Sequence, residues 1–317
     1  DFSLCGSMEG TIPTEIGLLE SSLRTLNLAE SSFTGTIPTE LGKLKQLEKL
    51  NLGMNQFKGT LPWQLGNLAS VKELLLSRSH LTGTLPKRLG ILDNLENLEL
   101  YGNELTGSIP EELGGLPSLK RIDCFNNRLS GTFPVSFVMA RMLQIVHIKN
   151  NRLTGSIPPG IGKLSRLSWL DLSNNFITGQ IPETLGSMSS LRDLRLGGNR
   201  IIGPIPESLC TNTLLNGGRV RQYGCGAILC PVGTRSNVGF ANDDADGSGN
   251  SGCITCPEGE TTQFLGSRKC RTFTQRDFLS LLFDAMGGET WPEEKRRGWK
   301  DDTLFECEWE GVSCDEE

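Results

Sequence analysis

A 24-residue phrase dominates the chain and limits what it can fold into. Each copy opens on an apolar residue, places two more at the fourth and sixth positions, and closes near Gly-x-Ile-Pro or a close variant. A fixed period of this length is typical of a solenoid, in which each unit buries its apolar residues against its neighbours. The copies begin, without a slip in register, at Leu23, Leu47, Val71, Leu95, Leu119, Leu143, Leu167 and Leu191.

One copy predicts the local structure of a single turn of the solenoid. Leu50 and Leu52 alternate with polar residues, and this period of two predicts a short strand with one face inward. Eight such strands, stacked in parallel at about 4.8 Å, would line one face of the molecule. The Gly-x-Ile/Leu-Pro phrase then turns the chain, because proline restricts φ where a strand cannot continue. The following Leu-Gly is expected to close a short helical or 3-10 segment on the opposite side.

An asparagine recurs three residues after the second strand leucine. An inward-pointing asparagine can pair buried backbone groups of adjacent turns, which an apolar residue would leave without partners. Ser31 and Ser79 occupy this position in two turns and are expected to weaken the ladder there. The recurring asparagines are Asn55, Asn103, Asn127, Asn151, Asn175 and Asn199.

The full phrase, L-x-x-L-x-L-x-x-N-x-L-x-G-x-I-P-x-x-L-G-x-L, resembles the plant-type extracellular leucine-rich repeat. The match covers residues 8–210, as eight turns and a partial first one. The resemblance implies a right-handed α/β solenoid with parallel strands on a concave face, a second short strand after the asparagine, and 3-10 or helical segments on the convex side. We expect this solenoid over residues 1–224, with a last edge strand over Leu215–Val220, a cysteine-rich module over 225–273 and a cap-like segment over 274–317.

The ten cysteines indicate an oxidising, extracellular setting, because nine of them crowd at the two ends of the chain. Cys124 instead takes a strand position that holds leucine elsewhere, and it is expected to be a buried free thiol. Cys5 has no evident partner within the chain. Spacing suggests three disulfides, although sequence alone leaves the connectivity open: Cys210–Cys225, Cys230–Cys253 and Cys256–Cys270.

Residues 226–273 contain two copies of a C-P-x-G motif, at Cys230 and Cys256, and resemble ephrin-receptor-like and tumour-necrosis-receptor-like cysteine modules. Zinc on Cys253-Ile-Thr-Cys256 is a weaker alternative, since neither a second pair nor a histidine lies nearby. Between the motifs, Asn242, Asp244 and Asp246 match the alternating oxygen ligands of a calcium loop. Position twelve of that loop is Cys253 rather than glutamate, so a solvated acidic loop is preferred and calcium is the alternative. No other cofactor is expected.

The final segment carries an apolar helical face and the phrase W-x(7)-W…C-x-W-x-G-V-x-C. This phrase resembles the N-terminal cap of plant-type leucine-rich-repeat proteins, and the resemblance implies a Cys307–Cys314 disulfide. The residues expected to contact a repeat array are Phe278, Leu282, Trp291, Trp299 and Trp309.

A cap that follows an array, together with a first turn that lacks one, predicts one unit of a tandem or head-to-tail array. Secreted algal leucine-rich-repeat proteins are similar in this organisation. A heterologous contact that does not close makes a filament. We therefore expect an extracellular structural or adhesive protein, either self-associating end to end or continuing into the next unit. An arbitrary chain boundary is the alternative explanation.

The outward-facing strand positions of the middle turns support a second functional hypothesis. Aromatic and apolar residues gather there and are expected to face solvent, and such patches on a solenoid's concave face commonly bind partners. The chain would then be a receptor ectodomain or inhibitor that recognises a protein, peptide or glycan. The predicted patch contains Leu75, Tyr101, Asp123, Phe125, Ile145, His147, Lys149, Trp169 and Asp171.

Several function classes are not expected. His80 and His147 accompany no nucleophile motif, and neither a phosphate loop nor a zinc-protease motif occurs, so we do not expect an enzyme. The net charge is −6, without an overall basic footprint for nucleic acid. No run is long enough for a transmembrane helix. Threonine ladders in the T-G-x-I-P phrase could order water as ice-binding solenoids do, but that phrase is ordinary for this repeat.

Overall fold

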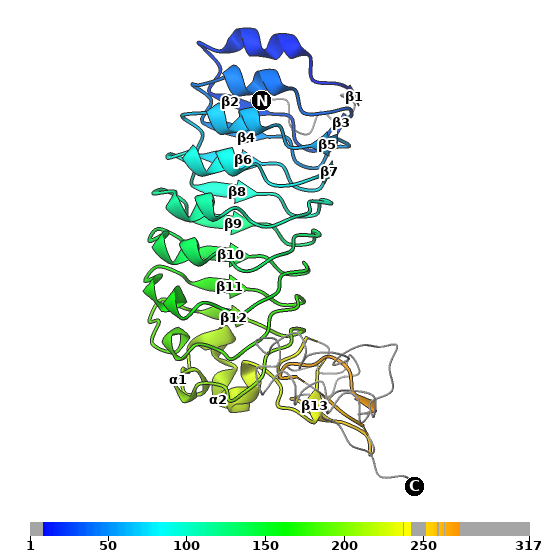
Figure 1. Cartoon of the computed structure of the whole chain (residues 1–317), viewed down its shortest axis with the longest axis vertical. Helices are drawn as coiled ribbons and strands as arrows, with labels where there is room; N and C mark the ends of the chain where they lie inside the picture. Colours follow the sequence, from blue (N-terminus) through cyan, green and yellow to red (C-terminus); the bar gives the residue numbers. More distant parts are fainter. Residues whose placement is uncertain (1–8, 237, 242–251, 259, 263, 273–317) are drawn as a thin grey trace, which may run out of the picture.

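The computed structural model describes residues 9–236, 238–241, 252–258, 260–262 and 264–272. Figure 1 shows a stack of like turns that ends on two short helices and a small side module. The predicted leucine-rich-repeat solenoid with a disulfide-rich module is confirmed.

The main sheet has eight parallel strands of three residues each. Each strand pairs with its neighbour at an offset of 24 residues, as Leu50 does with Leu74, so the sequence period is the register of the sheet. We call the solvent-facing side of this sheet, the predicted concave face, the strand face. In chain order its strands are β2 (Thr25–Asn27), β4 (Lys49–Asn51), β6 (Glu73–Leu75), β8 (Asn97–Glu99), β9 (Arg121–Asp123), β10 (Ile145–His147), β11 (Trp169–Asp171) and β12 (Asp193–Arg195).

Short strands and 3-10 segments complete each turn. The second strands form two parallel pairs, β1 (Glu9–Gly10) with β3 (Ser32–Phe33) and β5 (Lys58–Thr60) with β7 (His80–Thr82). In later turns each second strand is reduced to an isolated β-bridge, as between Thr84 and Thr106. The 3-10 segments run along the other side of the stack (Figure 1). They are η1 (Thr14–Leu19), η2 (Thr39–Lys43), η3 (Trp63–Asn67), η4 (Lys87–Ile91), η5 (Glu111–Gly115), η6 (Val135–Met139), η7 (Pro159–Lys163) and η8 (Glu183–Leu185).

The core is one continuous column of apolar side chains between the strands and the 3-10 segments. The inward strand leucines Leu50, Leu98 and Leu170 are fully buried, and burying one such side chain is worth about 1.5–3 kcal/mol. Cys124 is a buried free thiol, as predicted. Burial raises the pKa of the Cys124 thiol, so it behaves as a small apolar residue rather than a nucleophile.

The asparagines form the predicted ladder. Asn151 Oδ1 accepts a hydrogen bond from the Leu129 backbone N–H at 2.9 Å. Its Nδ2 donates to the carbonyls of Cys124 at 2.9 Å and Ile148 at 3.1 Å. One buried side chain therefore pairs backbone groups of its own turn and of the turn before it, which is why the position demands an amide.

The ladder weakens at Ser79, as predicted. The Ser79 hydroxyl is buried and forms no hydrogen bond among the described residues. It is too short to reach the backbone groups that Asn55 reaches one turn earlier, where Oδ1 accepts from Phe33 N–H at 3.0 Å.

Completing this ladder should stabilise the protein. We expect Ser79→Asn to raise the free energy of unfolding by about 1–2 kcal/mol, because the new amide would add the ladder hydrogen bonds that the Ser79 hydroxyl does not make. Urea denaturation of both chains measures the difference. An unchanged or lowered midpoint would show that the turn at Ser79 has relaxed around the serine.

The expected edge strand at Leu215–Val220 is wrong. Asn216, Gly217 and Gly218 all have positive φ, at 53°, 68° and 80°, a left-handed run that no strand accommodates. The chain instead forms α1 (Glu207–Cys210), η9 (Leu215–Gly218), α2 (Val220–Tyr223) and η10 (Gly224–Ala227). Asn216 caps the free edge of the main sheet, because its Oδ1 accepts from the N–H of Leu194 in β12 at 2.8 Å and its Nδ2 donates to the Ala227 carbonyl at 2.8 Å.

Three disulfides hold the end of the solenoid and the module, with the pairings that spacing suggests: Cys210–Cys225, Cys230–Cys253 and Cys256–Cys270. Both thiols of the C-x-x-C pair are thus oxidised, which removes the zinc alternative. The module contains two antiparallel pairs, β13 (Thr234–Arg235) with β14 (Ile254–Thr255) and β15 (Glu260–Thr261) with β16 (Arg271–Thr272).

Several predictions fall on parts of the chain that are not described. Cys5, the Cys307–Cys314 pair, the calcium candidates Asn242, Asp244 and Asp246, and the cap-like residues over 274–317 lie outside the described residues. Within the described part, none of the helices has the length and apolar character to cross a membrane.

Candidate binding surface on the strand face

Four aromatic rings form a continuous row across the strand face, three of them stacked and the fourth tilted. The centroids of Tyr101 and Phe125 are 4.5 Å apart with an interplanar angle of 5°, and those of Phe125 and His147 are 4.4 Å apart at 25°. His147 and Trp169 follow at 6.2 Å and 32°. We call these four residues the aromatic stripe. Each stacked pair adds about 0.5–1.5 kcal/mol beyond area burial, so the row is a rigid feature of the surface.

The stripe crosses the sheet diagonally. Tyr101 and Phe125 lie one repeat apart, whereas Phe125, His147 and Trp169 are each 22 residues apart, two fewer than the period. Since side chains alternate along a strand, a step of 22 keeps the same face while shifting two positions toward the strand's start. The rings occupy different positions of the 24-residue repeat, so the stripe is recognised in the sequence by the number of residues between successive rings.

An arginine caps each end of the stripe, and sequence reasoning missed both. The Arg78 guanidinium lies 5.8 Å from the centroid of Tyr101. The Arg195 guanidinium lies 5.2 Å from the nearest ring centroid of Trp169. Such cation–π contacts fix the outer rings and place a positive charge at either end of the apolar row.

Two carboxylates lie beneath the stripe instead of facing solvent, which corrects the prediction that the whole patch is exposed. Asp123 and Asp171 are each only 1% exposed. Their oxygens flank His147, with Asp123 Oδ1 at 3.4 Å from Nδ1 and Asp171 Oδ2 at 3.5 Å from Nε2. The rings and Arg121, whose Nη2 is 2.7 Å from Asp123 Oδ2, cover them. The two aspartates therefore flank the imidazole from below and do not themselves present a binding surface.

The other predicted patch residues surround the stripe. Leu75, Ile145 and Lys149 are half-buried on the same face. Ile145 pairs in register with Trp169, and Leu75 pairs with Glu99. The indole Nε1 of Trp169 is buried and has no hydrogen-bond partner among the described residues.

Glu99 lies beside the stripe in surroundings that disfavour its charged form. Burial raises the pKa of its carboxyl, the nearby Arg121 opposes the rise, and Asp123 adds to it. Arg121 Nε lies 3.4 Å from Glu99 Oε1. The native state therefore takes up a proton on Glu99 at a higher pH than the unfolded chain does.

This shift predicts a pH-dependent effect of Glu99→Gln. Between the ordinary pKa of 4.5 and the raised native pKa, the native carboxyl still holds a proton that the unfolded chain has lost. Over this pH range the free energy of unfolding of the wild type therefore falls as the pH rises. We therefore expect the stability of Glu99→Gln relative to the wild type to be higher at pH 7 than at pH 4.5. Thermal unfolding at both pH values measures the difference. A difference that grows on acidification would contradict the placement of Glu99.

Comparison with protein families supports the fold. The Leucine Rich Repeat model matches residues 22–44 and 46–68, the two-copy Leucine Rich repeats model matches 93–134, and a third Leucine rich repeat model matches 141–201. A search of curated proteins found no match.

Solved structures with the same fold include plant receptor ectodomains. The plant peptide hormone receptor RGFR1, in complex with RGF2, is 38% identical with a TM-score of 0.65, over 66% of this chain and 34% of that one. The Arabidopsis receptor kinase HAESA, in complex with the peptide hormone IDA and the co-receptor SERK1, is 34% identical with a TM-score of 0.56, over 66% and 39%. A plant ice-binding protein is 26% identical with a TM-score of 0.53, over 69% and 74%.

The chain spans about a third of the length of these receptor structures. The family matches and the structural likeness together support a leucine-rich-repeat protein of the plant type. With three disulfides, they also support an extracellular setting.

Proposed function

We propose that this protein is an extracellular recognition module that binds an extended peptide segment along the aromatic stripe. The observation that carries the proposal is the stripe itself, a row of three stacked rings and one tilted ring with an arginine at each end. Aromatic side chains and arginines are the residues that most often dominate the energy of protein interfaces.

The orientation of the rings favours a peptide over a glycan. Tyr101, Phe125 and His147 stack on one another, so their faces are largely used and their edges remain available to a ligand. A sugar stacks on an exposed ring face, whereas apolar peptide side chains pack against ring edges. The two arginines at the ends suit acidic groups or carbonyl oxygens of such a peptide. The likeness to receptor structures solved with peptide hormones supports the same choice.

The structural or adhesive array hypothesis is the second candidate and stays a prediction. It depends on a contact between the cap-like residues over 274–317 and the opening turn of an array, and those residues lie outside the described part. The likeness to receptor ectodomains favours recognition over this alternative.

Selection from a displayed library of random 15-residue peptides tests recognition. The full chain is used as bait, and each selected peptide is measured against the Phe125→Ala/Trp169→Ala variant. Because each ring is expected to be a hot spot of about 2 kcal/mol, we expect the double variant to bind at least about 100-fold more weakly.

A matched control removes two large apolar side chains from elsewhere. Trp63 and Met139 are both exposed and lie in the 3-10 segments η3 and η6, away from both the stripe and the module. Trp63→Ala/Met139→Ala should leave the affinity within about twofold, as is usual outside a hot spot. If no peptide distinguishes the stripe variant from the wild type, recognition by the stripe is wrong.

A further inference from the structure

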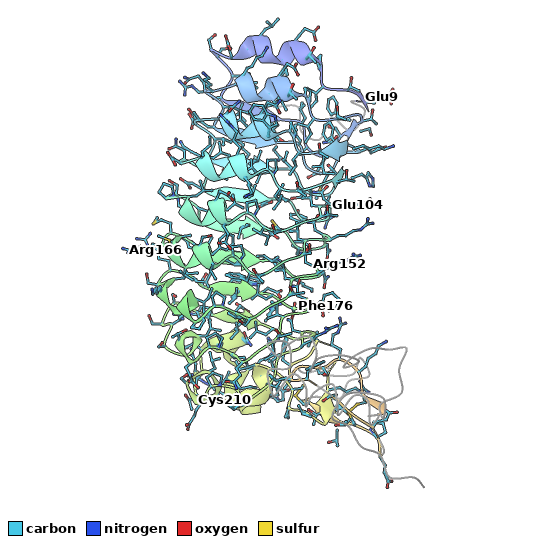
Figure 2. All side chains as sticks on the ribbon, viewed as in Figure 1. Glu9, Glu104, Arg152, Arg166, Phe176 and Cys210 are labelled. Atoms are coloured by element: carbon cyan, nitrogen blue, oxygen red, sulfur yellow. A yellow bond between two sulfur atoms is a disulfide. The ribbon has the colours of Figure 1, made fainter. Side chains whose placement is uncertain are left out.

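An open groove lies where the disulfide-rich module meets the last two turns of the solenoid. Its volume is about 670 Å³. On the solenoid side it is lined by Phe176 and Arg200 with their neighbouring asparagines. On the module side it is lined by Arg235, Phe264, Ser267, Arg268 and Lys269. Figure 2 shows Phe176 on the edge of the stack next to the module, away from the 3-10 segments.

The groove is strongly positive. Four cationic side chains line it, and no carboxylate lines it among the described residues. They come from segments far apart in the sequence: Arg200 from the last turn, Arg235 from β13, and Arg268 and Lys269 from the loop before β16. In a chain whose net charge is −6, this concentration of positive charge is local and not a property of the whole surface.

The walls of the groove are rigidly joined. Gly198 N–H donates to the Gly266 carbonyl at 3.0 Å, and Leu265 N–H donates to the Ile201 carbonyl at 3.1 Å, so backbone hydrogen bonds cross the junction. Arg268 donates to Asn174 Oδ1 at 3.2 Å. The Cys256–Cys270 disulfide anchors the segment that carries Lys269. A preorganised arrangement of charges binds with less loss of conformational entropy.

The groove offers charge and apolar surface rather than amide groups. Asn175 and Asn199 already use their amides in the ladder, and Asn174 Nδ2 donates to Asn150. The Arg200 guanidinium lies 5.0 Å from the Phe176 ring centroid, and Phe176 is 41% exposed. Recognition of neutral sugars needs free amides and hydroxyls, whereas guanidinium groups beside phenyl rings match carboxylates separated by apolar atoms.

We propose that this groove is a second binding site, separate from the aromatic stripe, and that it takes an acidic peptide segment of a partner protein. Carboxylates of the segment would pair with Arg200, Arg235, Arg268 and Lys269. The methylene stems of its acidic side chains would pack on Phe176 and Phe264. Bidentate pairing of arginine with carboxylate makes such a site selective for carboxylates rather than for any anion of the right charge.

Fluorescence anisotropy of labelled decaglutamate with the full chain tests the proposal. The variant is Arg200→Gln/Lys269→Gln, in which both changed residues are exposed, and its thermal unfolding checks that it folds. The control is Arg152→Gln/Lys163→Gln, which removes the same charge from exposed positions outside the groove. Arg152 follows a ladder asparagine just as Arg200 does, and Figure 2 shows Arg152 on the same edge of the stack as Phe176.

We expect the wild type to bind decaglutamate, and the groove variant to bind about tenfold more weakly, because two of four charge pairs are lost. Binding should fall as sodium chloride is raised, since these charges are only partly shielded from solvent. The control variant, and the stripe variant Phe125→Ala/Trp169→Ala, should bind as the wild type does. This last result separates the groove from the proposed peptide site on the stripe.

Three outcomes would overturn the proposal. Equal weakening in the groove variant and the control would show a non-specific charge effect. Failure of the wild type to bind decaglutamate at low salt would remove the site. Binding of a sulfated tetrasaccharide in place of decaglutamate would assign the groove to a glycan.

Discussion

Replacing Asn151 with leucine is expected to lower the free energy of unfolding by about 2–6 kcal/mol. The change leaves the Leu129 N–H buried without its partner, which costs about 1–3 kcal/mol. It also removes one of two amide donors from the Cys124 and Ile148 carbonyls, which keep Asn127 and Asn175, and each lost hydrogen bond costs about 0.5–1.5 kcal/mol. Leucine is close to asparagine in size, so lost packing contributes little. Urea denaturation monitored by circular dichroism measures the effect.

The control for this variant is Asn94→Leu. Asn94 is exposed on the convex side and makes one hydrogen bond, to the Ala69 carbonyl at 2.9 Å. We expect a change within about 0.5 kcal/mol, as for most surface substitutions. Similar losses for both variants would mean that the ladder is not what holds neighbouring turns together.

Adding one methyl group at Gly197 is expected to separate the module from the solenoid. A Cβ at this position would lie 2.5 Å from the Val238 carbonyl oxygen and 3.0 Å from the Gly239 Cα, both backbone atoms of the module. We expect Gly197→Ala to cost about 2–3 kcal/mol through overpacking. Hydrogen exchange at the Gly198 and Leu265 amides, which bridge the junction, should also become faster.

Gly53→Ala is the matched control, since Gly53 occupies the same position of an earlier turn. There the nearest atom to a new Cβ is the Ser77 carbonyl oxygen at 3.3 Å, and other turns carry Tyr101 or Phe125 at this position. The need for glycine at 197 thus comes from the module and not from the repeat. If both alanine variants were equally stable, the close packing of module and solenoid would be wrong.

The repeat itself could be predicted from sequence because one phrase repeats under one set of physical constraints. Leu50, Asn151 and the Gly-x-Ile-Pro turns each act within a turn or between adjacent turns, so period and residue type determine their environment. The weakness at Ser79 followed from the same reasoning. The edge strand failed because its Asn-Gly-Gly tripeptide favours left-handed turns over strand.

The binding surfaces were predictable only in part. The four rings of the stripe were all identified, but Asp123 and Asp171 are buried because His147, from the turn between them, and Arg121, from the same strand as Asp123, lie over them. Those directions depend on side-chain conformation, which the period does not constrain. The groove at the module could not be predicted from sequence, because Arg200 and Lys269 come together only when the disulfide-rich module packs against the last turn.

The most direct test of recognition by the strand face is a crystal structure of the full chain with a peptide from the library selection. We expect an extended peptide over β8 to β11, with side chains against the edges of Phe125 and Trp169 and its ends near Arg78 and Arg195. A peptide bound on the 3-10 side, with the stripe bare, would contradict it.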